Sequence, residues 1–227
     1  IVQINSQGGI FSQGAETYLT NNVYEPQSGG MKYINTNVAT LYSQQTGVHY
    51  FRVAASGSAD AAITWTTGFE VLNDGKARAK NGLLFGTDTA AANALDDYEE
   101  GTYTPALRGS TTTGNATYHS RVGSYTKIGN TVHIQGGIHC SSMGGLDGAV
   151  YVTGLPFAAE TQSYTMNFSY GGSLNITGGT YITGYTSSND SEFIIRHWDA
   201  SGGTSNLDDS EFSDGAQIIW SGMYKIS

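Results

Sequence analysis

Residues 131–139 read TVHIQGGIH, and this stretch decides the fold class. Apolar and polar residues alternate along it, which is the pattern of a β-strand with one buried and one solvated face. The apolar face carries Val132, Ile134 and Ile138. The polar face carries Thr131, His133, Gln135 and His139. The stretch therefore predicts a strand of an antiparallel sheet that covers a core on one side.

The same reading extends towards the C-terminus. Residues 164–170, YTMNFSY, place three aromatic residues and a methionine on one face, with Thr, Asn and Ser opposite. Segments 193–198 and 218–220 read as largely buried strands, and Tyr224 and Ile226 would close a final strand. Turns rich in Gly separate these segments. Residues 102–227 are therefore predicted to form an antiparallel β-sandwich, jelly-roll-like tip domain.

Composition agrees with an all-β protein. Of 227 residues, 38% are hydrophobic, while 31 are Gly and 15 are Tyr, so good helix formers are scarce. The net charge of −9 argues against a nucleic-acid partner, because phosphate binding needs clustered Lys and Arg. The sequence has neither a basic amphipathic helix nor an apolar run of about 18 residues, so no membrane insertion is expected.

Residues 1–86 differ from the rest. Their apolar islands are short, for example 38–42, 48–53 and 69–72, and turn signals such as Asn73-Asp74-Gly75 separate them. Islands of this length cannot fill a single-chain core, so we expect a shaft or trimerisation region that shares apolar faces between chains. Residues 87–101 read as a connector, with an Ala run that predicts a short helix capped by Thr87 or Asp88.

Three motifs carry a family resemblance. Residues 95–107, LDDYEEGTYTPAL, resemble a junction found in many bacteriophage tail-fibre proteins. Residues 123–132, GSYTKIGNTV, and residues 152–157, VTGLPF, are similar to a strand-and-turn and a bend that follow it in that family. Upstream, residues 61–66 and Asn73-Asp74-Gly75 look like the shaft segments that precede the junction. The resemblance covers about residues 31–157 and ends where receptor-binding tips tend to diverge.

The resemblance implies a phage tail-fibre or receptor-binding protein located on the virion. It implies a homotrimer with a slender, interwoven shaft, a globular tip and a role in host recognition. Because the chain starts at Ile1, we expect a missing N-terminal part that joins other phage tail proteins. The motifs themselves have structural explanations: Gly129-Asn130 suits a hairpin turn, and Gly154 with Pro156 suits a bend. They therefore mark a scaffold and leave the ligand open.

No catalytic or metal signature stands out. His133 and His139 share a strand face but would lie roughly 20 Å apart, too far to share an ion within one chain. An acid cluster, Asp208, Asp209, Glu211 and Asp214, does not match an EF-hand loop and reads as solvated. The single cysteine, Cys140, reads as a small buried hydrophobe. The sequence has no GxSxG, P-loop or HExxH motif, so we expect neither an enzyme nor a cofactor.

Sugar binding fits the sequence better. Aromatic rings stack on the apolar faces of sugars, while Asn, Asp and Arg bond their hydroxyl groups. Two polar, aromatic-flanked segments offer such groups near one end of a sandwich, where recognition is commonly built. The candidate receptor-binding residues are Tyr185, Asn189, Asp190, Arg196, His197, Trp198 and Asp199. The competing interpretation of Trp198 is a core residue.

The leading hypothesis is an adhesin that binds a bacterial surface polysaccharide or protein receptor during host attachment. The alternative is a purely structural fibre or decoration module. A third reading is a polysaccharide-degrading tailspike, which would need two positioned carboxylates among the 19 acidic residues.

Overall fold

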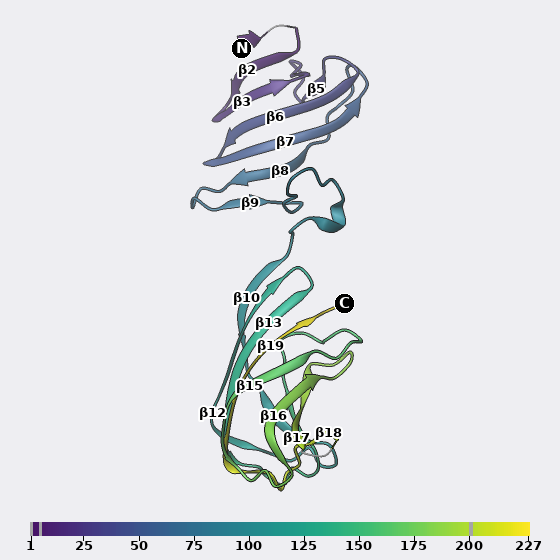
Figure 1. Cartoon of the computed structure of the whole chain (residues 1–227). Coiled ribbons are helices and arrows are strands. Elements are labelled where there is room, and N and C mark those ends of the chain that lie inside the picture. Colours follow the sequence, from purple (N-terminus) through teal and green to yellow (C-terminus); the bar gives the residue numbers. More distant parts are fainter. Residues whose placement is uncertain (1, 5, 200–201) are drawn as a thin grey trace. The chain divides into compact units, whose positions relative to one another are not determined.

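The structure, a computed structural model, describes residues 2–4, 6–199 and 202–227 and divides into two compact units, Ile1–Asp96 and Asp97–Ser227 (Figure 1). All strand pairs with a described register are antiparallel, which confirms the all-β prediction. In the described part of the chain, no helix is long and apolar enough to cross a membrane.

The N-terminal unit is a meander of seven strands in the order β1-β2-β3-β6-β7-β8-β9, with a small β4–β5 pair beside it (Figure 1). Its strands are β1 (Val2–Ile4), β2 (Gly8–Gln13), β3 (Glu16–Asn21), β4 (Val23–Tyr24), β5 (Lys32–Tyr33), β6 (Asn37–Gln45), β7 (Val48–Gly57), β8 (Thr66–Val71) and β9 (Ala77–Ala79). Exposed and buried residues alternate along β3 and β6, so the sheet has one covered and one open face.

The covered face has a small core. Val23, Tyr33, Ala39 and Ala54 are buried together, and Met31, Ile63 and Trp65 pack against them. The β4–β5 hairpin that brings Val23 and Tyr33 is anchored by the buried Asn22, whose side-chain amide donates to the carbonyl oxygens of Asn35 and Val38, both at 3.0 Å. The N-terminal sheet therefore has a buried core on one side only.

The predicted connector, 87–101, is divided between the two units. Its Ala run forms only a 3₁₀ turn, Ala91–Asn93, so the predicted helix capped by Thr87 or Asp88 is wrong. The residue before the turn is Ala90, without a side-chain cap, and its amide donates to the Asp88 carboxylate at 2.9 Å. A run this short cannot offset the cost of helix nucleation. Strand β10 (Tyr98–Tyr103) then joins the C-terminal sheet.

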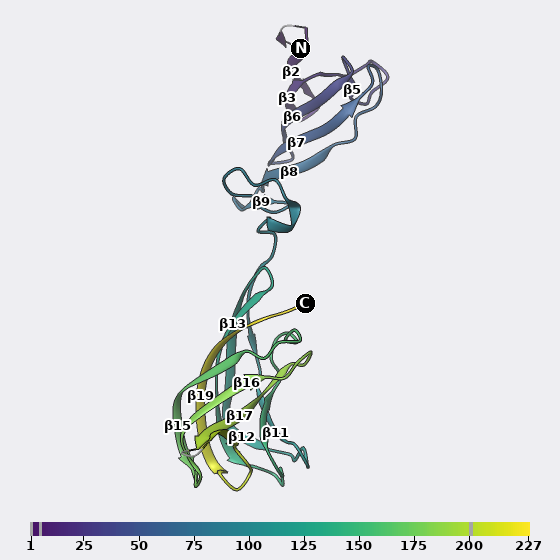
Figure 2. The same ribbon diagram turned by 45° about the vertical axis from the view of Figure 1, so that its right-hand side comes forward.

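The C-terminal unit is one continuous ten-stranded sheet in the order β10-β12-β13-β19-β15-β16-β17-β14-β11, with β18 paired to β17. The sheet curls around its own core, as Figure 2 shows from the side. The antiparallel architecture is confirmed, whereas a sandwich of two separate sheets is not. The remaining strands are β11 (Ala106–Gly109), β12 (Thr117–Ile128), β13 (Thr131–Ser142), β14 (Val150–Thr153), β15 (Thr165–Leu174), β16 (Gly179–Thr186), β17 (Glu192–Asp199), β18 (Gly203–Asn206) and β19 (Phe212–Lys225).

The core of this unit joins strands far apart in the sequence. The Trp220 ring from β19 packs edge-on against Phe193 from β17, with ring centroids 5.4 Å apart. Its indole N–H donates to the hydroxyl of Tyr103 from β10 at 3.3 Å. A Cβ at Gly136 would lie 2.6 Å from the Trp220 ring, so glycine is needed there. This explains why the apolar alternation of residues 131–139 pauses at that position.

Two strand predictions have different outcomes. Val132, Ile134 and Ile138 are all buried, which confirms the predicted inner face of β13. In β15, Met166 and Phe168 are buried as predicted, but Tyr170 is 48% exposed. A register shift between Phe168 and Tyr170 in the pairing with β19 turns Tyr170 outward. A bulge of this kind has no signal in a simple period-two pattern.

Candidate functional site

The structure distributes the seven predicted receptor-binding residues along the β16–β17 hairpin. Tyr185 pairs with Ile194, while Asp199 at the far end of β17 pairs with Gly179. Asn189 and Asp190 lie in the turn that precedes β17, and Trp198 and Asp199 lie where β17 ends. An eight-residue strand spans roughly 25 Å, so the two predicted loops lie at opposite ends of the strand rather than together.

His197 points into the core and cannot contact a receptor. It is 5% exposed, and its Nδ1 lies 3.4 Å from the carboxylate of the buried Glu211. Its neighbours along β17, Arg196 and Trp198, point outward because side chains alternate along a strand. Trp198 is 50% exposed, which contradicts its interpretation as a core residue.

Outward side chains of two neighbouring strands, β16 and β17, form a surface that we call the outer aromatic platform: Tyr181, Tyr185, Arg196 and Trp198. Tyr181 of β16 pairs directly with Trp198 of β17, which in turn pairs with Thr204 of β18. The two rings of this row are about equally open, at 51% for Tyr181 and 50% for Trp198. Tyr185 lies four residues further along β16 and is also exposed.

Arg196 is fixed within the platform by its neighbours. Its Nε donates to the Thr204 hydroxyl at 2.9 Å and its Nη1 to the Asn206 side chain at 2.5 Å. A third bond runs from Nη2 to the Thr204 carbonyl oxygen. The guanidinium also lies 5.8 Å from the centroid of the Tyr185 ring, a cation–π distance. Platform geometry is thus set before any ligand arrives.

The remaining predicted residues stabilise turns. The Asp199 carboxylate accepts from the Gly202 amide at 3.1 Å and from the Ser205 hydroxyl at 2.8 Å, across the β17–β18 connection. Asp190 accepts from the amide of Ser191 at 2.7 Å. Asn189 has φ of 57°, the left-handed region that Asn tolerates better than most residues. The polar character of Asp199, Asp190 and Asn189 therefore indicates turn formation as much as binding.

The sequence reading missed Tyr181, although a signal was present. Residues 179–186 read GTYITGYT, and the alternation places Tyr181, Thr183 and Tyr185 on one face, with Ile182 and Thr186 on the other. Register with β17 then brings Tyr181 beside Trp198. The first part could be read from the sequence, but the cross-strand pairing could not.

Residues considered for other chemistry have structural roles. Among the described residues, no group of three or more His, Cys, Asp or Glu side chains is placed to hold a metal ion. In the acid cluster, Asp209 accepts from the Gly148 amide at 3.0 Å and Asp214 from the Met143 amide at 2.7 Å, so these acids hold loops. Cys140 is fully buried, as predicted, and burial raises the pKa of its thiol.

Comparisons with known proteins give one fold likeness. No protein-family model matches the sequence, and no curated protein matches it. The structure is similar to the crystal structure of the Dettilon tailspike protein, with a TM-score of 0.50 and 19% sequence identity. The alignment covers 57% of this chain and 24% of the tailspike chain. Just over half of the chain therefore has a fold similar to part of a phage tailspike, and the matched part is about a quarter of that protein's length.

Proposed function

We propose that the chain is a phage tail protein of the virion that attaches to the host by binding a bacterial surface glycan. The observation that carries this proposal is the exposed row of Tyr181 and Trp198, held on rigid neighbouring strands. The fold likeness to a tailspike and the tail-fibre-like motifs support the same role. Receptor contact then lies on the strands of the C-terminal unit more than in its turns.

The chemistry of the platform suits a sugar. Ring faces offer apolar stacking area, and Thr183, Arg196 and Asn206 lie on the next cross-strand row to bond hydroxyl groups. Residues 95–227 carry five basic and 13 acidic residues, so this half of the chain has a net charge of −8. A field of that sign repels acidic polysaccharides and favours a neutral glycan.

We also propose that the chain acts as a homotrimer through the open face of the N-terminal sheet. Cross-strand pairing aligns one residue from each strand into a single apolar row: Val2, Ile10, Leu19, Tyr42, Phe51, Phe69 and Ala79. Phe51 is 48% exposed and Val2 64%. Monomeric soluble proteins rarely leave so continuous an apolar patch in water.

The charge pattern of this face favours a second copy of the chain as its partner. On β2, β3, β6, β7 and β8, the outward residues include no Lys, Arg, Asp or Glu, whereas Glu70 and Arg78 pair on the covered side. Chains with a net charge of −9 repel one another, and an uncharged face is where they can meet at least cost. The proposed number of three chains in the assembly rests on the resemblance to tail fibres.

Self-association would make a shallow sugar platform sufficient. Three linked copies of a weak site can gain on the order of 10²–10⁴ in avidity when the receptor geometry allows simultaneous contact. The proposed role is binding without hydrolysis, with other tail proteins of the virion as partners. The alternative remains a purely structural fibre module, and the third remains a polysaccharide-degrading tailspike.

The test is binding of the purified, labelled chain to a panel of bacterial strains and to a glycan array. Trp198→Ala and Tyr181→Ala should each weaken binding to the responsive strain at least tenfold without loss of folding. Tyr98→Ala is the matched control, because this tyrosine is 61% exposed and lies outside the platform. Full binding by both folded platform variants would refute the site. New reducing ends in incubated polysaccharide would refute the non-enzymatic role.

A further inference from the structure

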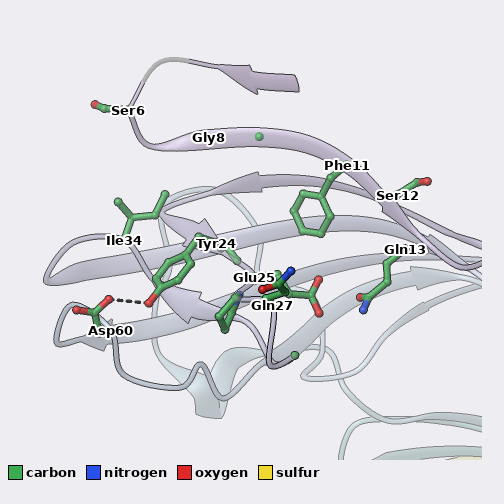
Figure 3. Close-up of a pocket in the computed structure, with 14 residues that line it drawn as sticks. Ser6, Gly8, Phe11, Ser12, Gln13, Tyr24, Glu25, Gln27, Ile34 and Asp60 are labelled. Atoms are coloured by element: carbon green, nitrogen blue, oxygen red, sulfur yellow. Dashed lines mark hydrogen bonds between the residues drawn. The ribbon is translucent and has the colours of Figure 1, made fainter. Parts of the chain in front are cut away.

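The N-terminal unit contains a cleft with aromatic and polar side chains that is separate from the outer aromatic platform. It has a volume of about 700 Å³ and lies between β2 and the segment that follows β4 (Figure 3). Phe11 and Tyr24 provide aromatic walls, and Glu25, Gln27 and Asp60 bring polar groups to it. Its volume is within the range typical of sites for small molecules.

Both aromatic walls are held in place by groups around the cleft. The Phe11 ring stacks on Tyr18, with centroids 5.0 Å apart and planes 29° apart, and Tyr18 is itself buried. The Tyr24 hydroxyl donates to the Asp60 carboxylate at 2.6 Å, which fixes the second ring (Figure 3). Rings fixed before binding lose little conformational freedom when a ligand stacks on them.

The loop that carries the polar groups is also tied down. The β4–β5 pair joins Val23 to Tyr33 and Tyr24 to Lys32. Beyond β4, the amide of Gly29 donates to the carbonyl oxygen of Pro26 at 2.9 Å and closes a turn. Glu25 and Gln27 therefore extend from a short, closed hairpin whose base is anchored in the small core.

The charges around the cleft restrict its ligand. Glu25 and Asp60 are acidic, and the described residues that line the cleft include no Lys, Arg or His. The other polar lining side chains are amides and hydroxyls, such as Gln13, Gln27 and Ser12. Carboxylates and amides bond sugar hydroxyls well, but carboxylates repel the anionic group of an acidic sugar.

We propose that this cleft is a saccharide site that takes a neutral sugar ring, stacked on Phe11, and rejects acidic sugars. The inference is independent of the outer aromatic platform, since the cleft belongs to the other unit and shares no residue with it. A chain with both sites would contact a glycan at two places in each copy.

The test uses saturation-transfer NMR with the full-length chain carrying Tyr181→Ala and Trp198→Ala, so that the platform is disabled. The probes are methyl glucoside, methyl galactoside, methyl mannoside and methyl glucuronide at millimolar concentration. At least one neutral glycoside should give transfer, and the glucuronide should give none. Gln27→Ala should weaken the neutral signal at least threefold, and Phe11→Ala should abolish it.

Removing one negative charge tests the predicted selectivity against acidic sugars. Glu25→Gln removes one carboxylate from an exposed loop and should raise the glucuronide signal relative to the neutral one. Transfer that is unchanged in Gln27→Ala and Phe11→Ala would overturn the proposal, as would equal transfer to glucoside and glucuronide or none to any glycoside. If Phe11→Ala does not fold, Gln27→Ala and Glu25→Gln decide alone. Failure here leaves the platform proposal standing, because that proposal is tested with the cleft intact.

Discussion

The two units use the same element, the antiparallel strand, but bury it differently. The C-terminal sheet curls, so that Trp220 and Tyr224 of β19 share one core with Phe193 of β17. The N-terminal sheet encloses only a small cluster around Tyr33 and Ala39 on one side. Its other side presents Phe51 and the rest of the apolar row to solvent.

This difference shows how antiparallel sheets can serve two tasks in one chain. A sheet that curls around a core buries its apolar side chains internally, so its outer surface is available for recognition. A sheet that stays open keeps an apolar face that only another molecule can cover. We therefore propose self-association through the N-terminal unit and receptor contact mainly through the C-terminal unit.

The largest effect is expected from breaking the open face. Phe51→Asp places a charge in the middle of the apolar row, where burial against a second copy would leave it without a counter-charge. Light scattering should give about three times the 24.0 kDa chain mass for the parent and a single chain mass for the variant. Val122→Asp, at an apolar C-terminal position that is 68% exposed, is the control and should keep the parent mass. A parent that is monomeric at micromolar concentration would contradict the assignment.

A smaller effect, confined to the C-terminal unit, is expected from opening its core. Trp220→Ala removes a ring that is 1% exposed and should lower the free energy of unfolding by about 3–5 kcal/mol. Trp198→Ala removes the same side chain from the surface and should change it by at most about 0.5 kcal/mol. Urea unfolding of both variants tests the contrast, and comparable losses for the two would show that the platform tryptophan is structural.

A still smaller effect is expected at high pH. Burial raises the pKa of Tyr103 to about 12, from an ordinary value of 10.0. The folded state therefore holds this proton more tightly than the unfolded chain does, so the stability it contributes is complete below pH 10 and is lost between pH 10 and 12. The loss for this group is about 2–3 kcal/mol. Burial raises the pKa of Tyr224 in the same direction.

Urea unfolding at a series of alkaline pH values measures this loss. Tyr103→Phe should make the decline shallower, leaving the part due to Tyr224 and to the other tyrosines whose pKa is raised, such as Tyr18 and Tyr164. If the free energy of unfolding stays level from pH 10 to 12, the hydroxyl groups of Tyr103 and Tyr224 are not buried in the core of the C-terminal unit.

Sequence periodicity predicted much of the fold and part of the site. Residue type predicted the buried state of Cys140. Periodicity predicted strands of the C-terminal unit and the inner face of β13. It could not show that the C-terminal sheet is continuous, because curling depends on which strands pair. It placed Tyr170 inward, since a register shift leaves no trace in residue type. For the site, it found Trp198 but grouped it with turn residues at the other end of β17.

The missed features all depend on pairing between distant segments. Tyr181 meets Trp198 only through the β16–β17 register. The apolar row needs seven strands aligned, although its members are separate in the sequence. The cleft joins Phe11, the segment after β4, and Asp60, three places with no shared motif. Local patterns predict which way a side chain points, but its neighbours are set by topology.

The central claim is that weak glycan contacts become host attachment when copies of the chain associate. The most direct test compares binding isotherms of the parent and Phe51→Asp on cells of one responsive bacterial strain. The parent should bind with an apparent affinity higher by on the order of 10²–10⁴, and the monomeric variant should retain a weak signal that Trp198→Ala weakens further. Equal affinity of the parent and a variant confirmed as monomeric would contradict the claim.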